Sequence, residues 1–160
     1  ELPFAEDYFD AVFCMNSFNF YGDNVEFLHH LLKHVKPGGQ LCIGSEVLAE
    51  EFSEEQLQNP PEVYSFRLPP PNEHVDVFED DFKRQHSPGW WCDLFERSGL
   101  LAVECCEELE DAAVLYQEMV RYEYEHDLDP FDVEICLAQM EWERTNSPQR
   151  SLFVLAAHKV

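Results

Sequence analysis

Residues 31–46, LLKHVKPGGQLCIGSE, run from a helical pattern of apolar residues through Pro37, Gly38 and Gly39 into a strand pattern. Proline lacks a backbone N–H and pushes the preceding Lys36 out of the helical region, and the two glycines permit left-handed backbone. We therefore predict that the helix ends here and that the chain reverses within about four residues. A helix that returns at once to a buried strand is typical of an α/β fold.

The sequence before this step predicts a strand and the start of the helix. FDAVFCM, residues 9–15, is nearly continuous apolar sequence rich in strand formers, which is typical of a strand covered on both faces of a parallel sheet. Asp23, with Glu26 three residues later, forms a capping-box pattern, and apolar side chains then recur at helical spacing over about residues 24–35. With a second strand at 40–46, the order is strand, helix, strand, which is the unit that joins parallel neighbours.

The next segment predicts an insertion, a capped helix and a third strand. Two proline runs interrupt any helix within residues 52–83, so we predict a Pro-rich insertion there. Ser87 and Pro88 then predict the start of a helix that Gly99 ends. LLAVECC follows as a strand.

The end of the chain predicts two helices and a final strand. Asp111 opens one helical pattern and Asp129-Pro130 opens another, and together they predict a paired-helix insertion over residues 111–146. SLFVLAAHK, residues 151–159, is the final strand. We predict a single α/β domain over residues 1–160.

The charge of the chain limits its partners. It carries 33 acidic and 10 basic side chains, a net charge of -23. This charge opposes attraction to phosphate backbones and anionic lipid, so we expect neither nucleic acid nor a membrane as partner. The acidic start ELPFAEDYFD has no signal-peptide pattern, and no run approaches the ~20 apolar residues of a membrane helix. We therefore expect a cytoplasmic protein.

The six cysteines predict reduced, buried thiols. None has the Cys-x-x-Cys spacing of a zinc or redox pair, and most have apolar neighbours. Glu26, His30 and His34 do fall at i, i+4 and i+8 on one predicted helix face. Because zinc sites rarely come from one helix alone, we interpret them as a solvated polar stripe and predict no metal site.

Leu2-Pro3-Phe4, Phe9-Asp10 and Pro37-Gly38-Gly39 follow one another in a recognisable order. In this order they resemble the second half of class I S-adenosylmethionine-dependent methyltransferases, where such motifs precede the fourth strand, begin it and lead to the fifth. The paired helices resemble the substrate-side insertion of small-molecule members of the family. The resemblance implies a partial Rossmann-like sheet of four strands, mostly parallel with one antiparallel strand, and S-adenosylmethionine as cofactor.

Two features of this family are missing. Its members carry a glycine-rich loop after the first strand and an acidic residue after the second, and this chain shows neither. We infer a C-terminal portion, roughly the second half of the domain. In the family's strand order residues 9–15 then lie at an exposed edge, although their composition favours burial. We expect the missing N-terminal half, or a second copy of the chain, to cover that Phe9–Met15 edge.

Candidate site residues come from the carboxyl ends of the strands, where open α/β sheets bind ligands. The resemblance implies that Met15, Asn16 and Ser17 contact the methionine part of the cofactor. The candidates for substrate binding are Phe18, Tyr21, Glu46, Trp90 and Tyr116. Tyr21 and Glu46 are also the catalytic candidates: a carboxylate can orient an amine or accept a proton, and aromatic faces favour a cation.

Each of these residues also has a structural interpretation. The aromatic side chains can belong to the core, the polar residues after the first strand can cap a turn, and Glu46 can be a solvated carboxylate. At least one of Trp90 and Trp91 should pack in the core, because their helix has an apolar face.

The resemblance implies in-line methyl transfer to a small-molecule acceptor, by a chain that we expect to be inactive alone. The alternative is a non-catalytic interaction module, a degenerate methyltransferase half that pairs through its apolar edge.

Overall fold

The computed structural model describes residues 3–21, 23–64, 82–126, 130–147 and 149–160. The strands in this part of the chain are β1 (Phe9–Met15), β2 (Val35–Leu48), β3 (Leu101–Glu108) and β4 (Arg150–Lys159). The longer helices are α1 (Val25–Leu32), α4 (Pro88–Ser98), α5 (Ala112–Glu125) and α6 (Pro130–Glu143). Shorter helical segments are η1 (Phe18–Tyr21), α2 (Glu54–Gln58), η2 (Glu62–Tyr64) and η3 (Phe82–Arg84).

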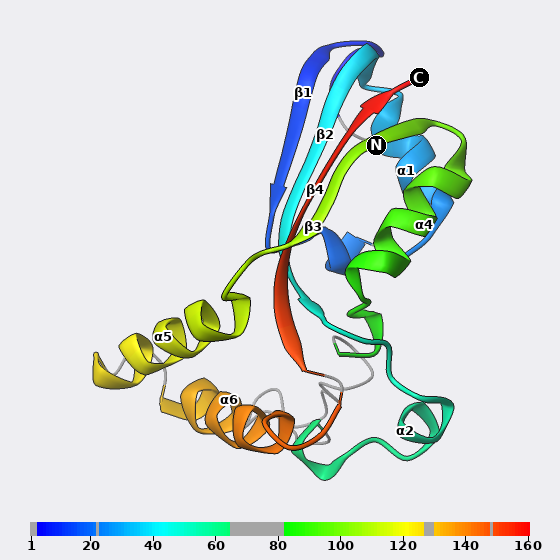
Figure 1. Cartoon of the computed structure of the whole chain (residues 1–160). Helices are drawn as coiled ribbons and strands as arrows, with labels where there is room; N and C mark the ends of the chain where they lie inside the picture. Colours follow the sequence, from blue (N-terminus) through cyan, green and yellow to red (C-terminus); the bar gives the residue numbers. More distant parts are fainter. Residues whose placement is uncertain (1–2, 22, 65–81, 127–129, 148) are drawn as a thin grey trace.

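The strands form one sheet in the order β1-β2-β4-β3 (Figure 1). Residues 11–15 of β1 pair in parallel with residues 40–44 of β2, which confirms the predicted strand-helix-strand unit. β4 runs antiparallel to both β2 and β3. One strand therefore opposes the other three, as expected. Because β4 lies inside the sheet, however, only the β1–β2 pair is parallel, and the sheet is mixed by pairing rather than mostly parallel.

The main core lies between one face of the sheet and helices α1 and α4 (Figure 1). α4 begins and ends as predicted: the Ser87 side chain accepts a hydrogen bond from the Trp90 N–H at 3.3 Å, Pro88 lies in the first turn, and Gly99 ends the helix with a φ of 65°. Trp91 is 3% exposed and belongs to this core. The packing of α1 and α4 against this face of the sheet thus holds the strands in place.

The Lys36-Pro37-Gly38-Gly39 step lies inside β2, because the strand begins at Val35. These residues bulge opposite Asp10, and regular parallel pairing resumes beyond them. Gly38 has a φ of 73°, and a Cβ on Gly39 would lie 3.0 Å from the Asp10 carbonyl oxygen and 2.8 Å from a Val35 methyl carbon. The glycines are therefore required by a bulge, and the predicted reversal at this step is wrong.

The chain reverses before that bulge, at Lys33 and His34, because α1 ends at Leu32. The start of α1 also differs from the prediction. Asn24 is the N-cap, and its side-chain oxygen accepts a hydrogen bond from the Phe27 N–H at 2.9 Å. Asparagine and aspartate cap equally well, so the one-residue difference was not readable from residue type.

The interpretation of Glu26, His30 and His34 as one solvated stripe is wrong for His34. This residue lies beyond α1, is 8% exposed, and has its Nδ1 atom 3.0 Å from the Ala5 carbonyl oxygen. Within the described ranges, no group of three or more His, Cys, Asp or Glu side chains is arranged to hold a metal ion.

The second face of the sheet is open along β1. Phe13 and Met15 are 71% and 72% exposed. They alternate with Val12 and Cys14, which pack against the main core, so they point to the opposite face. β1 is also an edge of the sheet, as expected. The expected cover on both faces of this strand is not provided by the described part of this chain.

The predicted helices before the last strand are present as α5 and α6, which lie at one end of the sheet (Figure 1). α5 packs against β4 and α6, and α6 packs against η2. Residues 65–81 of the predicted 52–83 insertion lie outside the described residues. The insertions and the single domain stay predictions. None of the helices in the described ranges has the length and apolarity needed to cross a membrane.

The cysteines whose side chains the structure describes are free and half-buried, not buried. Burial raises the pKa of the Cys106 thiol to about 12. The Cys106 Sγ atom donates to the Pro88 carbonyl oxygen at 3.3 Å. A thiol in this setting is a poor nucleophile at neutral pH, which agrees with a packing role.

Candidate functional site

The carboxyl ends of β1 and β2 are joined by Asn16. Its backbone N–H donates to the Gly44 carbonyl oxygen at 2.7 Å, and its side-chain oxygen accepts from the Glu46 N–H at 3.1 Å. Asn16 has a φ of 50°, a left-handed conformation that asparagine tolerates better than most residues. This turn fixes the position of Glu46 relative to the end of β1.

A mostly apolar pocket of about 220 Å³ lies beside this turn. Four of the predicted site residues line it: Met15, Asn16, Glu46 and Tyr116. The other lining residues come from β2, β4 and the segment leading into and along α5: Gly44, Ser45, Leu109, Leu115, Met119, Leu152, Phe153 and Val154. The structure therefore brings the two strand ends and the first paired helix to one hollow.

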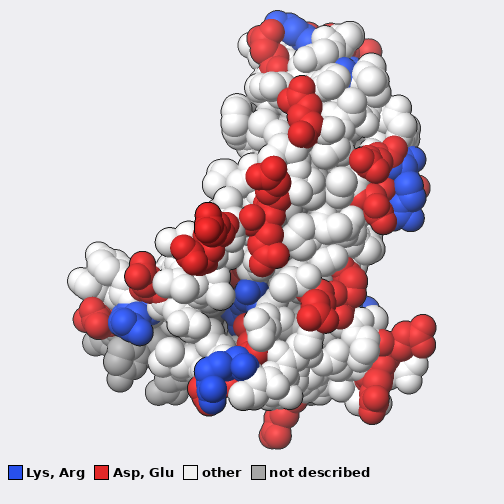
Figure 2. Space-filling model, in the orientation of Figure 1, with Lys and Arg blue, Asp and Glu red and all other residues white. Residues whose placement is uncertain are grey.

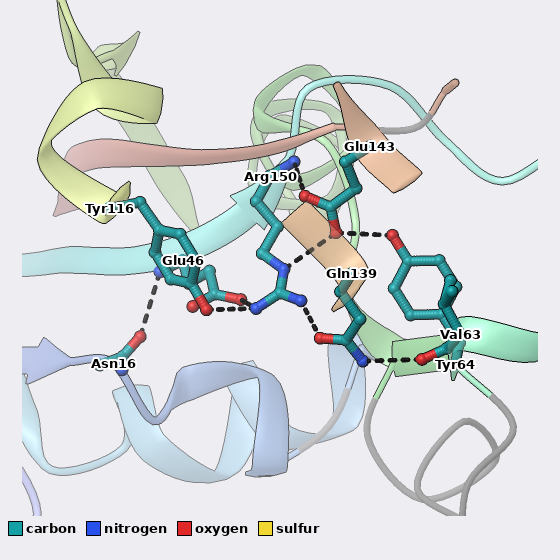
Figure 3. A network of polar contacts seen from close by, with 8 residues as sticks. All are labelled: Asn16, Glu46, Val63, Tyr64, Tyr116, Gln139, Glu143 and Arg150. Carbon is teal, nitrogen blue, oxygen red and sulfur yellow. Dashed lines mark hydrogen bonds and ion pairs between the residues drawn. The ribbon is translucent and has the colours of Figure 1, made fainter. Parts of the chain in front are cut away.

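Arg150, at the start of β4, is the centre of the polar contacts behind this pocket (Figure 3). Its side chain is only 4% exposed and its guanidinium lies 3.5 Å from a Glu46 carboxylate oxygen. The Arg150 Nη1 atom, which is the nitrogen nearest to Glu46, also donates to the Tyr116 hydroxyl. The guanidinium carbon lies 5.0 Å from the centre of the Tyr116 ring. Arg150 thus links two side chains that were predicted to bind substrate.

The other side of Arg150 contacts α6. Its Nε donates to Glu143 at 3.1 Å, and a terminal nitrogen donates to Gln139. Glu143 is 5% exposed and also accepts the Tyr64 hydroxyl at 2.6 Å. Burial, followed by the Glu143 charge and hydrogen bond, raises the pKa of Tyr64 far above its ordinary value, so this phenol donates throughout the working pH range.

The sequence interpretation missed Arg150, Gln139 and Glu143, and it did not connect Tyr64 with them. Tyr64 and Glu143 are 79 residues apart, so no local spacing joins them. Two signals were available. Gln139 and Glu143 have i, i+4 spacing on one predicted helix face, and Arg150, one of only 10 basic residues, directly precedes an apolar strand.

The remaining predicted site residues lie elsewhere. The Ser17 hydroxyl is 3.1 Å from the Cys14 Sγ atom, within the turn after β1. Phe18 is 2% exposed and belongs to the main core. Tyr21 is 59% exposed on η1. Trp90 stacks on His86 with ring centres 3.6 Å apart. Their roles in binding stay predictions.

The pocket fits one side of a site for a sulfonium cofactor. Its wall is apolar beside Met15 and Val154, and a carboxylate, Glu46, stands at its polar part. These are the chemistries that a thioether-like group and a positive charge prefer. The six glycines of the chain include no Gly-x-Gly pair, so these residues do not supply the glycine-rich loop that lets the backbone approach the cofactor.

Residues 1–43 match the family described as "Methyltransferase domain". No curated protein matches the chain.

Solved structures match over nearly the whole chain. A putative sarcosine dimethylglycine methyltransferase from Galdieria sulphuraria has a TM-score of 0.66 at 11% identity, over 99% of this chain and 56% of that one. A geranyl diphosphate C-methyltransferase from Streptomyces coelicolor A3(2) has a TM-score of 0.58 at 14% identity, over 100% and 51%. The (4+2)-cyclase SpnF has a TM-score of 0.63 at 14% identity, over 99% and 53%.

At these identities the structural matches establish the fold alone, and the chain spans about half the length of each of these three structures. The resemblance predicted from the sequence is therefore confirmed: the chain forms part of a class I S-adenosylmethionine-dependent methyltransferase fold, and its first 43 residues match the methyltransferase domain family.

Proposed function

We propose that this chain is the C-terminal portion of a methyltransferase that transfers a methyl group from S-adenosylmethionine to a small molecule, and that it is inactive alone. The observation that carries the proposal is the meeting of Met15, Asn16 and Glu46 with Tyr116 at one apolar pocket. The end of β1 supplies the cofactor side, and Glu46 of β2 with Tyr116 of α5 supplies the acceptor side. This is the division expected at the carboxyl edge of an open α/β sheet.

The residues of this chain would align and dehydrate the acceptor. S-adenosylmethionine, when bound, supplies a methyl group on a positively charged sulfonium, so near-attack geometry contributes more than acid-base chemistry. Met15 and Leu152 line the pocket and would exclude water once the open face of the sheet is covered. Glu46, oriented by Asn16 and Arg150, holds the acceptor or accepts its proton. Tyr21 is the second catalytic candidate, from the segment after β1.

The open side of the sheet supports a partner in the same proposal. Phe13 and Met15 are largely exposed on the second face, and the β1 edge has backbone groups available for pairing. We propose that the N-terminal half of the domain, or a second copy of this chain, covers that edge and face. The N-terminal half is favoured, because it would also bring the missing glycine-rich loop.

The surface charge supports the expected absence of polyanionic partners. On the face drawn in Figure 2, Asp and Glu side chains are spread from the sheet to the helices, and Lys and Arg side chains occur in only a few places. Such a surface repels phosphate backbones and anionic lipid. A neutral or cationic small molecule is the favoured methyl acceptor.

A second candidate function is a non-catalytic interaction module that pairs through β1. The open apolar edge favours it equally, and the fold is shared with a protein whose name is a cyclase, so the fold by itself does not fix methyl transfer.

Titration calorimetry with S-adenosylmethionine distinguishes the two candidates. We expect weak or no binding by residues 1–160 alone, and micromolar binding after addition of the polypeptide encoded upstream of Glu1. If the two polypeptides associate but still bind no cofactor, the interaction module is correct and the enzyme proposal is wrong. Glu46→Gln should lower methyl transfer by the completed domain, because it removes the carboxylate that holds the acceptor or accepts its proton.

A further inference from the structure

Three buried side-chain oxygen atoms belong to residues that line one narrow crevice next to the candidate site. They are the Asn19 Oδ1, Ser45 Oγ and Gln85 Oε1 atoms, and none of them has a hydrogen-bond partner among the residues that the structure describes. Asn19, Ser45 and Gln85 are 8%, 8% and 7% exposed. All three residues line the crevice together with Glu46.

The three unpaired oxygens cost the folded protein stability at this one crevice. A buried polar group without a hydrogen bond is rare in native proteins, and each one destabilises the fold appreciably. The crevice has no space for a water molecule in the present arrangement, so solvent does not pair these oxygens. The Ser45 hydroxyl reaches neither amide oxygen. The three oxygens are therefore unpaired at residues that line the same crevice, and a donor could reach them only after a side chain moves.

The crevice adjoins the apolar pocket described above. Ser45, Glu46 and Phe153 line both hollows. Ser45 lies on the core-facing side of β2, in alternation with Glu46, so the crevice is on the α4 side and meets the pocket at Glu46. One small molecule can thus place an apolar body in the pocket and a polar head in the crevice.

The chemistry of the oxygens selects that head group. Two are amide carbonyl oxygens and accept only, and the third is a hydroxyl that also accepts. Their partner must therefore donate hydrogen bonds. A protonated primary amine has three donors, a hydroxyl has one, and a carboxylate has none. The nearby Glu46 carboxylate further favours a cation over an anion.

Resting on the proposed function, we propose that Asn19, Ser45 and Gln85 form the subsite for an amine head group of the methyl acceptor. To admit it, the side chain of Gln85 moves; this residue lies two positions before Ser87, the N-cap of α4. The subsite sets which acceptor binds, and it leaves the site of cofactor binding unchanged.

The test uses 2-phenylethylamine as the probe, with 2-phenylethanol and 3-phenylpropionate as comparison compounds of similar apolar size. Binding to residues 1–160 is followed by the NMR signals of the Asn19 and Gln85 side-chain amides. We expect the amine to shift both signals and to bind at least about tenfold more tightly than the carboxylate, because only the amine pairs the buried oxygens. Equal affinity for the amine and the carboxylate overturns the proposal.

Variants separate this subsite from general surface binding. Ser45→Ala and Gln85→Leu should each weaken amine binding at least about tenfold, because each removes one acceptor for a charged donor. Neither should lower the stability of the fold, since each removes an unpaired buried oxygen. Gln58→Leu, at an exposed position on α2, is the matched control and should change nothing. Amine affinity unchanged in both subsite variants overturns the proposal.

A failure of the subsite and a failure of the proposed function give different results. If the amine fails to bind while cofactor binding is restored by the upstream polypeptide, the subsite is wrong and the methyltransferase stands. If the amine binds at these residues but the upstream polypeptide restores no cofactor binding, the amine site is correct and the methyltransferase proposal is wrong.

Discussion

Replacing Arg150 with methionine should lower the free energy of unfolding by about 3–5 kcal/mol, the cost of breaking a buried ion pair from one side. The Arg150 side chain is 4% exposed and contacts Glu143, whose own side chain is 6% exposed. Removing the guanidinium leaves the buried Glu143 carboxylate without the positive charge of Arg150. Because a domain of this size is typically stable by about 5–15 kcal/mol, the loss is a large fraction of the whole.

A double-mutant cycle with Glu143→Gln isolates this cost. The neutral amide carries no charge to leave unpaired, so Arg150→Met in that background should cost less, with a coupling of about 2 kcal/mol between the two positions. Arg144→Met is the matched control. Its ion pair with Glu141 lies on the surface, at 65% and 71% side-chain exposure, so its loss should change stability by no more than about 0.5 kcal/mol.

The assay is urea unfolding followed by tryptophan fluorescence and circular dichroism. Trp142 lies beside Tyr64, with ring centres 5.6 Å apart, so it reports on the network directly. For a domain of this length, 3–5 kcal/mol corresponds to a fall in Tm of roughly 6–20 °C. A loss below about 1 kcal/mol for Arg150→Met, or the absence of coupling with Glu143→Gln, would refute the reasoning that this network is buried and mutually satisfied.

Three further predictions concern separate parts of the chain. Gly39→Ala should destabilise the fold by about 1–3 kcal/mol, because the added Cβ would clash with backbone atoms at the bulge. Gly89→Ala should stabilise the fold by about 0.5–1 kcal/mol, because its Cβ would lie in open space on α4. The urea midpoints of the two variants check both predictions. A pKa of about 12 leaves Cys106 almost no thiolate at pH 8, so its alkylation by iodoacetamide, followed by mass spectrometry, should be at least about tenfold slower in the folded than in the urea-unfolded chain; equal rates contradict the burial of this thiol. Burial acts to raise the pKa of Glu51, but the hydrogen bonds from His86 and Ser87 outweigh it and lower the pKa overall. The ionised Glu51 therefore stabilises the fold at pH values above the ordinary carboxyl pKa, and this stabilisation is lost as the pH falls through the lowered pKa. The difference in unfolding free energy between wild type and Glu51→Gln should therefore shrink between about pH 6 and pH 3, the range in which carboxyl groups titrate. A difference that stays constant with pH contradicts this prediction.

The sheet and the helices were predictable because their signals are local. Residues 11–15 of the apolar run pair with residues 40–44 as expected, and Ser87, Pro88 and Gly99 mark the ends of their helix. The bulge at residues 36–39 was not predicted, because Pro-Gly-Gly fits a turn and a bulge equally well by residue type. Only the pairing of β2 with β1 distinguishes them, and pairing is a tertiary property.

The candidate site was predictable at the strand ends and at Tyr116 of the first paired helix. Met15, Asn16 and Glu46 follow from the rule that ligands bind at carboxyl ends, and the structure brings them to one pocket. Arg150 was not predictable in the same way. Its partners come from the end of β2, from α5 and from α6, and burial of a charged side chain depends on packing that no single segment encodes.

Hydrogen–deuterium exchange of the amides in Phe9–Met15 tests the central claim most directly, because that claim is that this edge is completed by another polypeptide. Those amides of β1 that do not bond to β2 should exchange rapidly in residues 1–160 alone. Addition of the upstream polypeptide together with S-adenosylmethionine should slow their exchange at least about a hundredfold, as expected for amides that enter a sheet. Unchanged exchange on this strand, in a mixture that binds the cofactor, would contradict the account.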